Sequence, residues 1–232
     1  MESIAAPSPN FDDRPPNTPI DILILHYTGM QTGAAAVARL CDPEAGVSAH
    51  YTVDEDGTVF THVPEERRAW HAGISYWAGT RDVNARSIGI EIVNPGHEFG
   101  YRSFPGSQIE AVIRLAREVV KRRKIPAARV LGHSDVAPAR KMDPGELFPW
   151  GRLAHAGIGL WPQTRKCALA VPFESGLRAF GYGLPPDMDV PMATVIAAFQ
   201  RHFRPAKIDG CADAECECIL AALLQEIDIS GG

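Results

Sequence analysis

Short apolar runs separated by polar turns dominate the first half of the chain. Residues 21–27, DILILHY, form a nearly continuous apolar run, which is typical of a central strand covered on both faces. Residues 47–53 and 58–63 are two further runs joined at an Asp-Gly turn, a pattern that predicts a hairpin. A fourth run, residues 129–133, ends at a histidine. The pattern therefore predicts a β-sheet with polar residues where some of its strands end.

Residues 87–94 alternate in the manner of a strand with two different faces. Ile88, Ile90 and Ile92 share one face, because successive side chains of a strand point to opposite sides. The other, less apolar face carries Glu91 in mid-strand.

The clearest helical stripe covers residues 107–124, where apolar residues recur at helical spacing and basic residues close the C-terminal end. Ser107 and Glu110 have the spacing of a capping box. The Ala-rich residues 34–41 predict a shorter helix. Loops are expected at residues 65–81, 134–149 and 151–171. Together these patterns predict an α/β domain with a mixed central sheet flanked by helices.

Beyond residue 171 the pattern changes to three short helical stripes, at residues 174–180, 191–203 and 212–226. We expect them to form a small three-helix domain with a core of its own, built from Phe180, Val195, Phe199, Ile208, Ile219 and Leu223. The predicted organisation is an N-terminal arm at residues 1–19, a main domain at 20–165 and the helical domain at 172–229.

Charge and composition narrow the function classes. A net charge of -5 and a pI near 5.9 lack the basic excess that nucleic acid or an anionic membrane surface requires. We expect no membrane insertion, since no segment approaches the length of a membrane span. The first residues have neither the basic nor the apolar region of a secretory signal, so a cytoplasmic location is expected, with the periplasm as the alternative. No pattern predicts an oligomeric state.

The five cysteines are expected to be reduced, because their number is odd and three crowd near the C-terminus. Cys216 and Cys218 lack the spacing of a metal site, and Cys218 is expected in the core.

A candidate metal site comes from three separate elements. His26 and His133 each stand where a strand ends, and Asp143 lies on the Pro-rich loop that follows the second strand. Two imidazoles and one carboxylate suit Zn²⁺ with one open position for water. Pro138 and Pro144 limit the freedom of the loop, which lowers the entropic cost of holding these side chains together. Any one of the three residues alone would be explained as an ordinary polar residue at a strand end, and only the set of three indicates a metal site.

Several motifs in fixed order resemble a known family. They are ILHYT at 24–28, SAHY at 48–51, WHAG at 70–73, SIGIEIVN at 87–94 and GHSDVAPARKMDPG at 132–145. This series resembles the zinc-dependent N-acetylmuramoyl-L-alanine amidases of the amidase-2 family, nearest to its AmiD type and next to its AmpD type. Phage amidases and peptidoglycan recognition proteins are relatives of that family. The resemblance covers about residues 20–150.

The resemblance implies a role for each matching residue. His26, His133 and Asp143 would bind zinc, Glu91 would activate the zinc-bound water, and Lys141 would support the developing oxyanion. These roles agree with the chemistry of a metal-bound water, a carboxylate base and a fixed cation. The bond cut would be the amide that joins the lactyl group of N-acetylmuramic acid to L-alanine.

Substrate contacts are expected from seven further residues, Tyr27, His50, Trp70, His71, Asn84, Arg86 and Ser134. For His50 a place in the core or behind the metal ligands is an equal alternative. Asp135 is expected to orient the loop without touching the metal. The remaining histidines are expected at surface or structural positions, namely His62, His97, His155 and His202.

The C-terminal helices resemble a peptidoglycan-binding domain of the three-helix type, through residues 177–183, 195–203 and 208–210. Cys216 departs from that pattern, so the segment either binds glycan or buttresses the main domain. Whichever role the segment has, the expected partner of the whole protein is its substrate, peptidoglycan or a muropeptide.

Three alternatives remain open at this point. The first is a non-catalytic peptidoglycan-recognition module, which zinc content would separate from an enzyme. The second is a cysteine hydrolase that uses Cys41 as nucleophile. The third concerns the substrate: the lack of a signal suits recycling of 1,6-anhydro-muropeptides, whereas the second domain suits polymeric or periplasmic peptidoglycan.

Overall fold

The described part of the chain is built around a mixed six-stranded sheet. The computed structural model describes residues 2–162 and 170–230. The strand order is β1-β5-β4-β7-β3-β8, and every neighbouring pair is parallel except β4 with β5. The strands are β1 Ile4–Ala5, β3 Ile22–Tyr27, β4 Tyr51–Val53, β5 Val59–Thr61, β7 Ser87–Ile92 and β8 Val130–Gly132. The predicted α/β class and the hairpin of β4 and β5 are confirmed.

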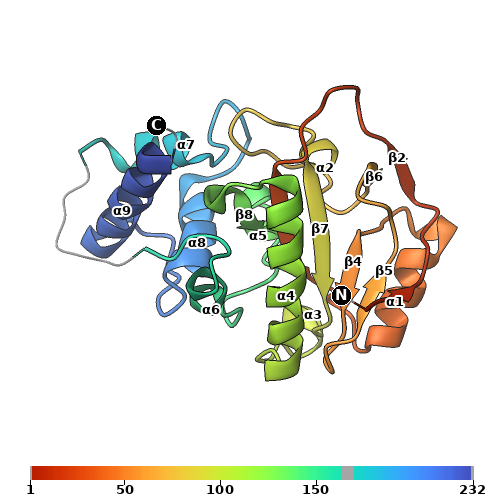
Figure 1. Ribbon diagram of the computed structural model, residues 1–232. Helices are drawn as coiled ribbons and strands as arrows, with labels where there is room; N and C mark the ends of the chain where they lie inside the picture. Colours follow the sequence, from red (N-terminus) through yellow and green to blue (C-terminus); the bar gives the residue numbers. More distant parts are fainter. Residues whose placement is uncertain (1, 163–169, 231–232) are drawn as a thin grey trace.

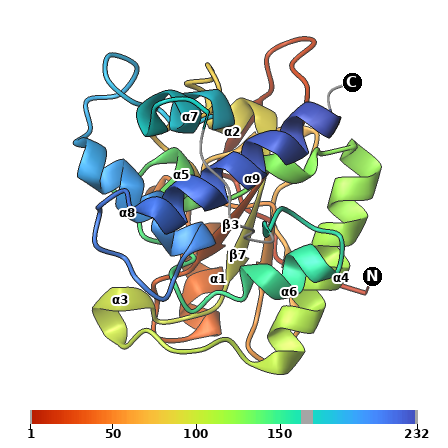
Figure 2. The same cartoon turned by 90° about the vertical axis from the view of Figure 1, so that its left-hand side faces the viewer.

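Helices cover both faces of this sheet, with α4 along one face and the C-terminal helices grouped together on one side of the molecule (Figures 1 and 2). Their bounds are α1 Gly33–Cys41, α2 Val83–Arg86, α3 Gly96–Phe99, α4 Gly106–Arg123, α5 His133–Val136, α6 Trp150–His155, α7 Phe173–Phe180, α8 Met192–Phe203 and α9 Ala214–Ser230. Single 3₁₀ turns occupy Pro43–Ala45 and Ala127–Arg129. In the described residues no helix is both long and apolar enough to cross a membrane.

The register of β3 and β7 places two polar residues of the sequence prediction side by side. His26 is the register partner of Glu91 across these parallel strands. The alternation along β7 turns Ile88, Ile90 and Ile92 into the core on the opposite face, as predicted.

The face that carries these isoleucines is covered by α4 and α6. Ile109, Val112 and Val119 of α4 are fully buried there, in the positions that the helical stripe predicts. The capping box is wrong, because the helix begins directly after Pro105 and Ser107 lies inside its first turn. The Ser107 hydroxyl instead donates to the Glu55 carbonyl oxygen at 3.0 Å.

The other face of the sheet is covered by α7, α8 and α9, which we call the helical unit. Its apolar side chains form one continuous cluster with Ile22, Ile24 and Leu131 of the sheet. The prediction of a separate three-helix core is therefore wrong. Ile208 lies outside the cluster, and it is Cys216, not Cys218, that is fully buried in it.

The N-terminal arm is held against the main domain by backbone pairing. Strand β1 extends the main sheet, and β2 Phe11–Asp13 pairs with β6 Arg67–Ala69 in a second, two-stranded sheet. The Arg14 guanidinium donates to the carbonyl oxygens of Ala85 and Ser87, which lie at the end of α2 and the start of β7. The arm therefore fixes the N-terminal end of the strand that carries Glu91.

Three of the expected loops contain regular structure. Strand β6 lies within residues 65–81, α5 begins at His133, and α6 begins at Trp150. Each is a strand or helix of six residues or fewer, too short to produce a periodic signal in the sequence. Part of the expected linker, residues 163–169, lies outside the described residues.

Candidate active site

Three atoms that can each bind a metal ion converge near the carboxyl ends of β3 and β8. Nδ1 of His26 lies 3.0 Å from Nδ1 of His133 and 3.0 Å from Oδ2 of Asp143, and His133 Nδ1 is 3.1 Å from the same oxygen. All three side chains are buried, and we call them the metal cluster. They meet because β3 and β8 are parallel neighbours, so the residues at their ends share one edge of the sheet.

The hydrogen bond of Nε2, the ring nitrogen of His133 that points away from the cluster, defines the tautomer of this ring. Nε2 of His133 lies 3.0 Å from the carbonyl oxygen of Ala72, which can only accept a hydrogen bond. Nε2 therefore carries the proton of the neutral ring, and the lone pair of Nδ1 points into the cluster. Burial, reinforced by the neighbouring His133, lowers the pKa of His26 to about 4, so the His26 ring is neutral near pH 7.

The carboxyl group of Asp143 completes a negatively charged set. Two imidazole lone pairs and a carboxylate at such short range leave a place for a cation. Tetrahedral Zn²⁺ with bonds of about 2.0–2.2 Å spaces its donors by roughly 3.4 Å, close to the arrangement seen here.

The outer nitrogen of His26 starts a chain of hydrogen bonds. His26 Nε2 lies 3.0 Å from Nδ1 of His71, and His71 Nε2 lies 3.2 Å from the Ser87 hydroxyl. That hydroxyl donates to the Val83 carbonyl oxygen at 2.7 Å. The terminal acceptor sets the direction: each group donates toward Val83, so His26 donates through Nε2 and keeps the lone pair of Nδ1 for the cluster.

Gly89 of β7 makes room for the His71 ring. A Cβ atom at position 89 would lie 2.6 Å from Cγ of His71, a distance that real contacts do not reach. Three alternate residues of β7 therefore face the site, each with a different role. Ser87 hydrogen-bonds to His71, Gly89 leaves space for the His71 ring, and Glu91 lines the cavity.

Backbone contacts hold the loop that carries Asp143. The backbone nitrogen of Ser134 donates to the Asp143 carbonyl oxygen at 2.9 Å, which ties the ligand loop to α5. The Tyr101 hydroxyl donates to the Pro144 carbonyl oxygen at 2.8 Å. A Cβ atom at Gly145, where φ is +86°, would collide with Tyr101, so only glycine suits this position. These contacts therefore fix the backbone at Asp143 and Pro144.

A cavity of about 430 Å³ opens over the metal cluster. Glu91 lines it beside the cluster, and its Oε2 atom is buried without a hydrogen-bond partner among the described residues. Burial and the nearby Asp143 charge raise the pKa of Glu91 well above its usual value, while Lys141 opposes the shift. A partnerless carboxyl group beside an electron-rich metal cluster is suited to exchange a proton with something bound in the cavity.

Residues 16–146, more than half of the chain, match the family Amidase_2, described as N-acetylmuramoyl-L-alanine amidase. AmiD of Escherichia coli K12 is 38% identical over 232 residues, which cover 89% of this chain and 83% of that protein. The chain belongs to the Amidase_2 family. The prediction of an N-acetylmuramoyl-L-alanine amidase is thereby confirmed, and the rival of a non-catalytic recognition module is not supported.

Two solved structures resemble this amidase along most of its length. AmiD from E. coli, in complex with anhydro-N-acetylmuramic acid-L-Ala-D-gamma-Glu-L-Lys, superposes with a TM-score of 0.79 at 39% identity, over 91% of both chains. AmpDh3 from Pseudomonas aeruginosa, in complex with an anhydromuramic pentapeptide, has a TM-score of 0.82 at 36% identity, over 90% of this chain and 92% of that chain. The likeness thus includes the helical unit as well as the main domain.

The cavity of the amidase brings together most of the residues predicted from the sequence. The metal cluster, Glu91 and Lys141 all line it, as do three of the predicted substrate residues, Tyr27, Trp70 and His71. The Trp70 indole nitrogen donates to Asp12 of the arm at 2.7 Å, and the Tyr27 hydroxyl lies 3.0 Å from Nδ1 of His97. Both aromatic rings are therefore held in place at the wall of the cavity.

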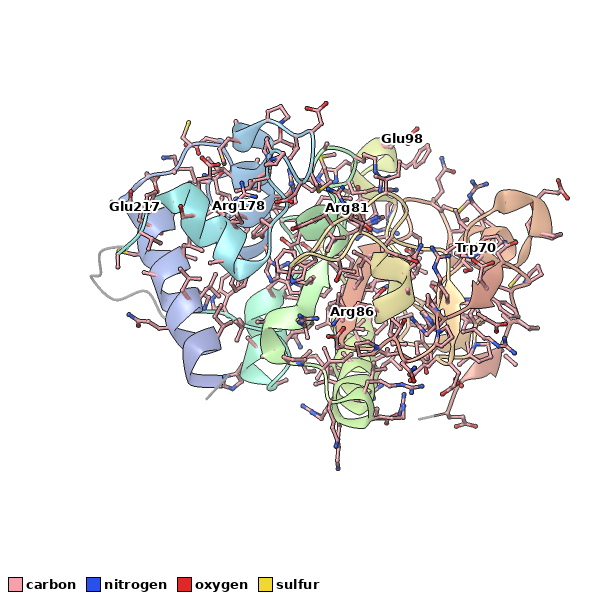
Figure 3. The ribbon with its side chains drawn as sticks, turned by 90° about the horizontal axis from the view of Figure 1, so that it is seen from above. Trp70, Arg81, Arg86, Glu98, Arg178 and Glu217 are labelled. Carbon is pink, nitrogen blue, oxygen red and sulfur yellow. The ribbon has the colours of Figure 1, made fainter. Side chains whose placement is uncertain are left out.

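Four predicted substrate residues do not line the cavity, namely His50, Asn84, Arg86 and Ser134. His50 and Asn84 accept backbone hydrogen bonds, from Gly89 and from Ala72 respectively. Arg86 pairs with Asp21, and Figure 3 shows it apart from Trp70 and Glu98 of the cavity. His50, Asn84 and Arg86 precede the strands β4 and β7, whereas the metal cluster lies at the opposite, carboxyl ends of the parallel strands.

Sequence reasoning missed part of the cavity wall. His97, expected at a surface or structural position, lines the cavity and stacks on Tyr101 at 4.4 Å between ring centroids. Arg39 of α1 and Arg140, next to Lys141, add positive charge to the wall. The available signal for Arg140 was its place on the ligand loop, directly before Lys141. Nothing in the local sequence marks Arg39, which the fold brings to the cavity.

The thiol of Cys41 does not line the cavity. It donates to the Ala6 carbonyl oxygen at 3.2 Å, and burial raises its pKa, which disfavours the reactive thiolate. The alternative of a cysteine hydrolase is therefore not supported.

Proposed function

We propose that the amidase holds one Zn²⁺ ion on His26, His133 and Asp143 and uses it to hydrolyse the amide bond between N-acetylmuramic acid and L-alanine. The convergence of two imidazole lone pairs and one carboxylate oxygen within 3.1 Å carries this proposal. Bound zinc would supply a water whose pKa is lowered toward ~7 and a Lewis acid for the carbonyl group.

Glu91 is the general base in this proposal. Its raised pKa and partnerless Oε2 atom favour uptake of a proton from the attacking water. The same carboxyl group then returns the proton to the departing amine of L-alanine. Because Glu91 is fixed by strand register beside His26, the base needs no rearrangement to reach the reacting centre.

Lys141 is the electrostatic partner of the developing oxyanion. It lines the cavity and forms no ion pair within 4 Å among the described residues, so its ammonium group is available to a ligand.

We expect Lys141→Met to lower kcat by about 10²–10³, the range found when one oxyanion donor is removed. Zinc content should stay at the wild-type level, because Lys141 is not a ligand in this proposal. The matched control is Lys121→Met, which removes an exposed lysine from the last turn of α4. Unchanged kcat in the Lys141 variant would remove the assigned role.

We infer that the preferred substrate is a small 1,6-anhydro-muropeptide. The related AmiD and AmpDh3 structures contain ligands of this chemistry, and E. coli AmpD, 31% identical over 63% of this chain, is named a 1,6-anhydro-N-acetylmuramyl-L-alanine amidase. The cationic wall at Arg39 and Arg140 suits the carboxylates of an acidic stem peptide.

The deciding experiment measures zinc content and peptide release from a purified anhydro-muropeptide, before and after chelation. Release that stops on chelation and returns with zinc supports the zinc amidase and the recycling role. Release from intact peptidoglycan at equal or higher kcat/KM would favour wall hydrolysis and the periplasmic alternative. No bound zinc in the active wild-type protein would overturn the proposed metal.

His71 should set zinc affinity through its hydrogen bond to His26. We expect His71→Leu to weaken zinc binding by about 10–100-fold, as loss of such outer partners commonly does. His71→Asn, whose side chain can still accept from Nε2 of His26, should recover part of that loss. Chelator competition measures both values, and equal affinity in wild type and His71→Leu would contradict the role.

A further inference from the structure

A second buried polar cluster lies directly behind the metal cluster. Asp135 of α5 is 1% exposed, and its Oδ2 atom accepts a hydrogen bond from the Gly132 backbone nitrogen at 2.8 Å. The same oxygen lies 2.7 Å from Nδ1 of His202, and Oδ1 accepts from the Tyr182 hydroxyl at 2.6 Å. The carboxyl group thus has three donors, which is what a buried carboxylate requires.

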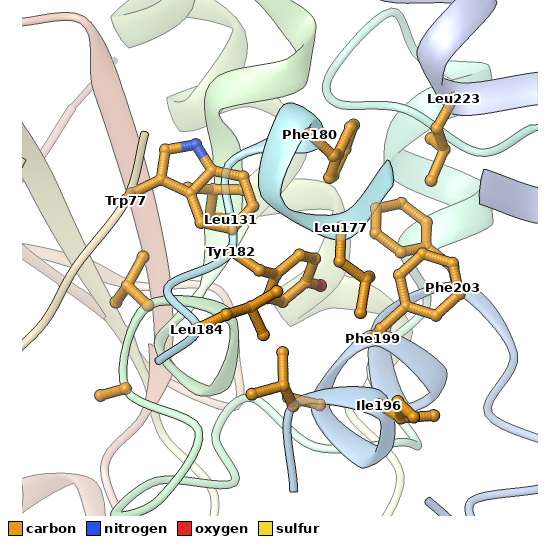
Figure 4. Packing of buried hydrophobic residues seen from close by; sticks show 14 of the residues in the cluster. Trp77, Leu131, Leu177, Phe180, Tyr182, Leu184, Ile196, Phe199, Phe203 and Leu223 are labelled. Atoms are coloured by element: carbon orange, nitrogen blue, oxygen red, sulfur yellow. The ribbon is translucent and has the colours of Figure 1, made fainter. Parts of the chain in front are cut away.

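Two of these donors come from the helical unit. Tyr182 follows α7, and Figure 4 shows it packed among Leu131, Leu177 and Leu184. Burial and the charge of Asp135 raise the pKa of Tyr182 well above its usual value, so its hydroxyl remains a donor.

His202 of α8 is held in one orientation by flat packing on both sides. Its ring stacks on Trp150 at 3.8 Å and on Phe203 at 3.9 Å between centroids. Its Nε2 atom is buried without a partner among the described residues. The polar contact of the ring is therefore directed at Asp135 alone.

The residues that Asp135 holds are adjacent to a metal ligand. Gly132, whose backbone nitrogen it binds, is the residue before His133, and α5 begins at His133 itself. The Ala137 nitrogen closes this turn by donating to the His133 carbonyl oxygen at 3.0 Å. The position of the His133 backbone thus depends on Asp135, while Ala72 orients the ring.

We propose that Tyr182 and His202 are positioning residues that act through Asp135 on the metal ligand His133, so that the helical unit is part of the metal centre. This inference rests on the proposed zinc amidase function. It assigns the helical unit a role that requires no glycan binding.

Energetics favour positioning over simple stabilisation. A carboxyl group buried in an apolar cluster generally gives less stability than apolar side chains of the same volume would give in its place. Apolar side chains surround this polar group, among them Leu131, Val136 and Phe199, which are fully buried. The carboxyl group of Asp135 accepts three hydrogen bonds, and these bonds fix its orientation. Because one of them holds the Gly132 backbone, they also fix the position of the adjacent residue His133.

The test measures zinc dissociation by chelator competition in the full-length chain, together with Tm of the zinc-free protein. Tyr182→Phe removes one hydroxyl oxygen, and we expect it to weaken zinc binding about tenfold, the lower end of the range for outer partners of metal ligands. His202→Leu should do the same, and His202→Asn, whose amide nitrogen can replace Nδ1, should recover most of the affinity.

Ile219→Ala is the control for stability alone. Ile219 lies in the same apolar cluster and makes no hydrogen bond to Asp135, so this variant should lower Tm and leave zinc affinity unchanged. Wild-type zinc affinity in Tyr182→Phe and His202→Leu would overturn the inference, and Tyr182→Phe decides the matter if His202→Leu fails to fold. A wild-type protein that binds no zinc would instead overturn the proposed function.

Discussion

Replacing Glu91 with glutamine is expected to lower kcat by about 10²–10⁴, the usual contribution of a general acid–base group. Glutamine keeps the size of the side chain and removes its ability to take up a proton. Glu91 contributes no atom to the metal cluster, so zinc content should remain at the wild-type level. The measurement is kcat and KM for release of the peptide, with zinc determined on the same samples.

The expected pattern for this variant is a loss in kcat with little change in KM, because the base acts in the chemical step. Glu91→Ala should behave in the same way. Glu110→Gln, which removes an exposed carboxyl group of α4 outside the cavity, is the matched control and should leave kcat unchanged. Full activity of Glu91→Gln with zinc bound would show that another group moves the proton.

The residues on strands were predictable because their placement follows from a period of two. The alternation of β7 puts Glu91 opposite the buried isoleucines, and parallel pairing then sets it beside His26. The ends of neighbouring parallel strands share an edge, which is why His133 joins them. Both features follow from the regular geometry of strands, so they can be predicted from the order of residues alone.

The direction of the strands was a signal that the sequence interpretation did not use. Asn84 and Arg86 come before β7, at the end of the sheet that lies away from the cluster. Their backbone and ion-pair partners follow from that position. A substrate role for a residue next to a catalytic strand depends on which end of the strand it occupies.

Contacts between distant segments could not be predicted from local pattern. The hydrogen bond from His26 to His71 needs both the path of residues 65–81 and the space above Gly89. Asp135 meets Tyr182 and His202 across separations of 47 and 67 residues. The helical stripes gave α7 and α8 correctly, but the face that they bury is set by the sheet, so the independent core was wrong.

Replacing Asp143 with alanine is expected to abolish stoichiometric zinc binding and reduce peptide release by several orders of magnitude. The variant removes the only carboxylate of the three described side chains and leaves the two imidazoles of His26 and His133. Without zinc the attacking water keeps a pKa near 15.7 in place of about 7, so its hydroxide form is lost at neutral pH.

Thermal unfolding gives a second measurement of this variant that does not depend on turnover. A ligand at 100 times its Kd stabilises the folded state by about 2.7 kcal/mol, which raises Tm by roughly 5–10 °C in a protein of this size. Zinc should produce this rise in the wild type and none in Asp143→Ala. His97→Ala changes a cavity histidine outside the metal cluster and should keep the response. A zinc-dependent rise of Tm in Asp143→Ala equal to that of the wild type would mean that the metal is held elsewhere. Loss of the rise together with loss of turnover would tie both to the same three side chains.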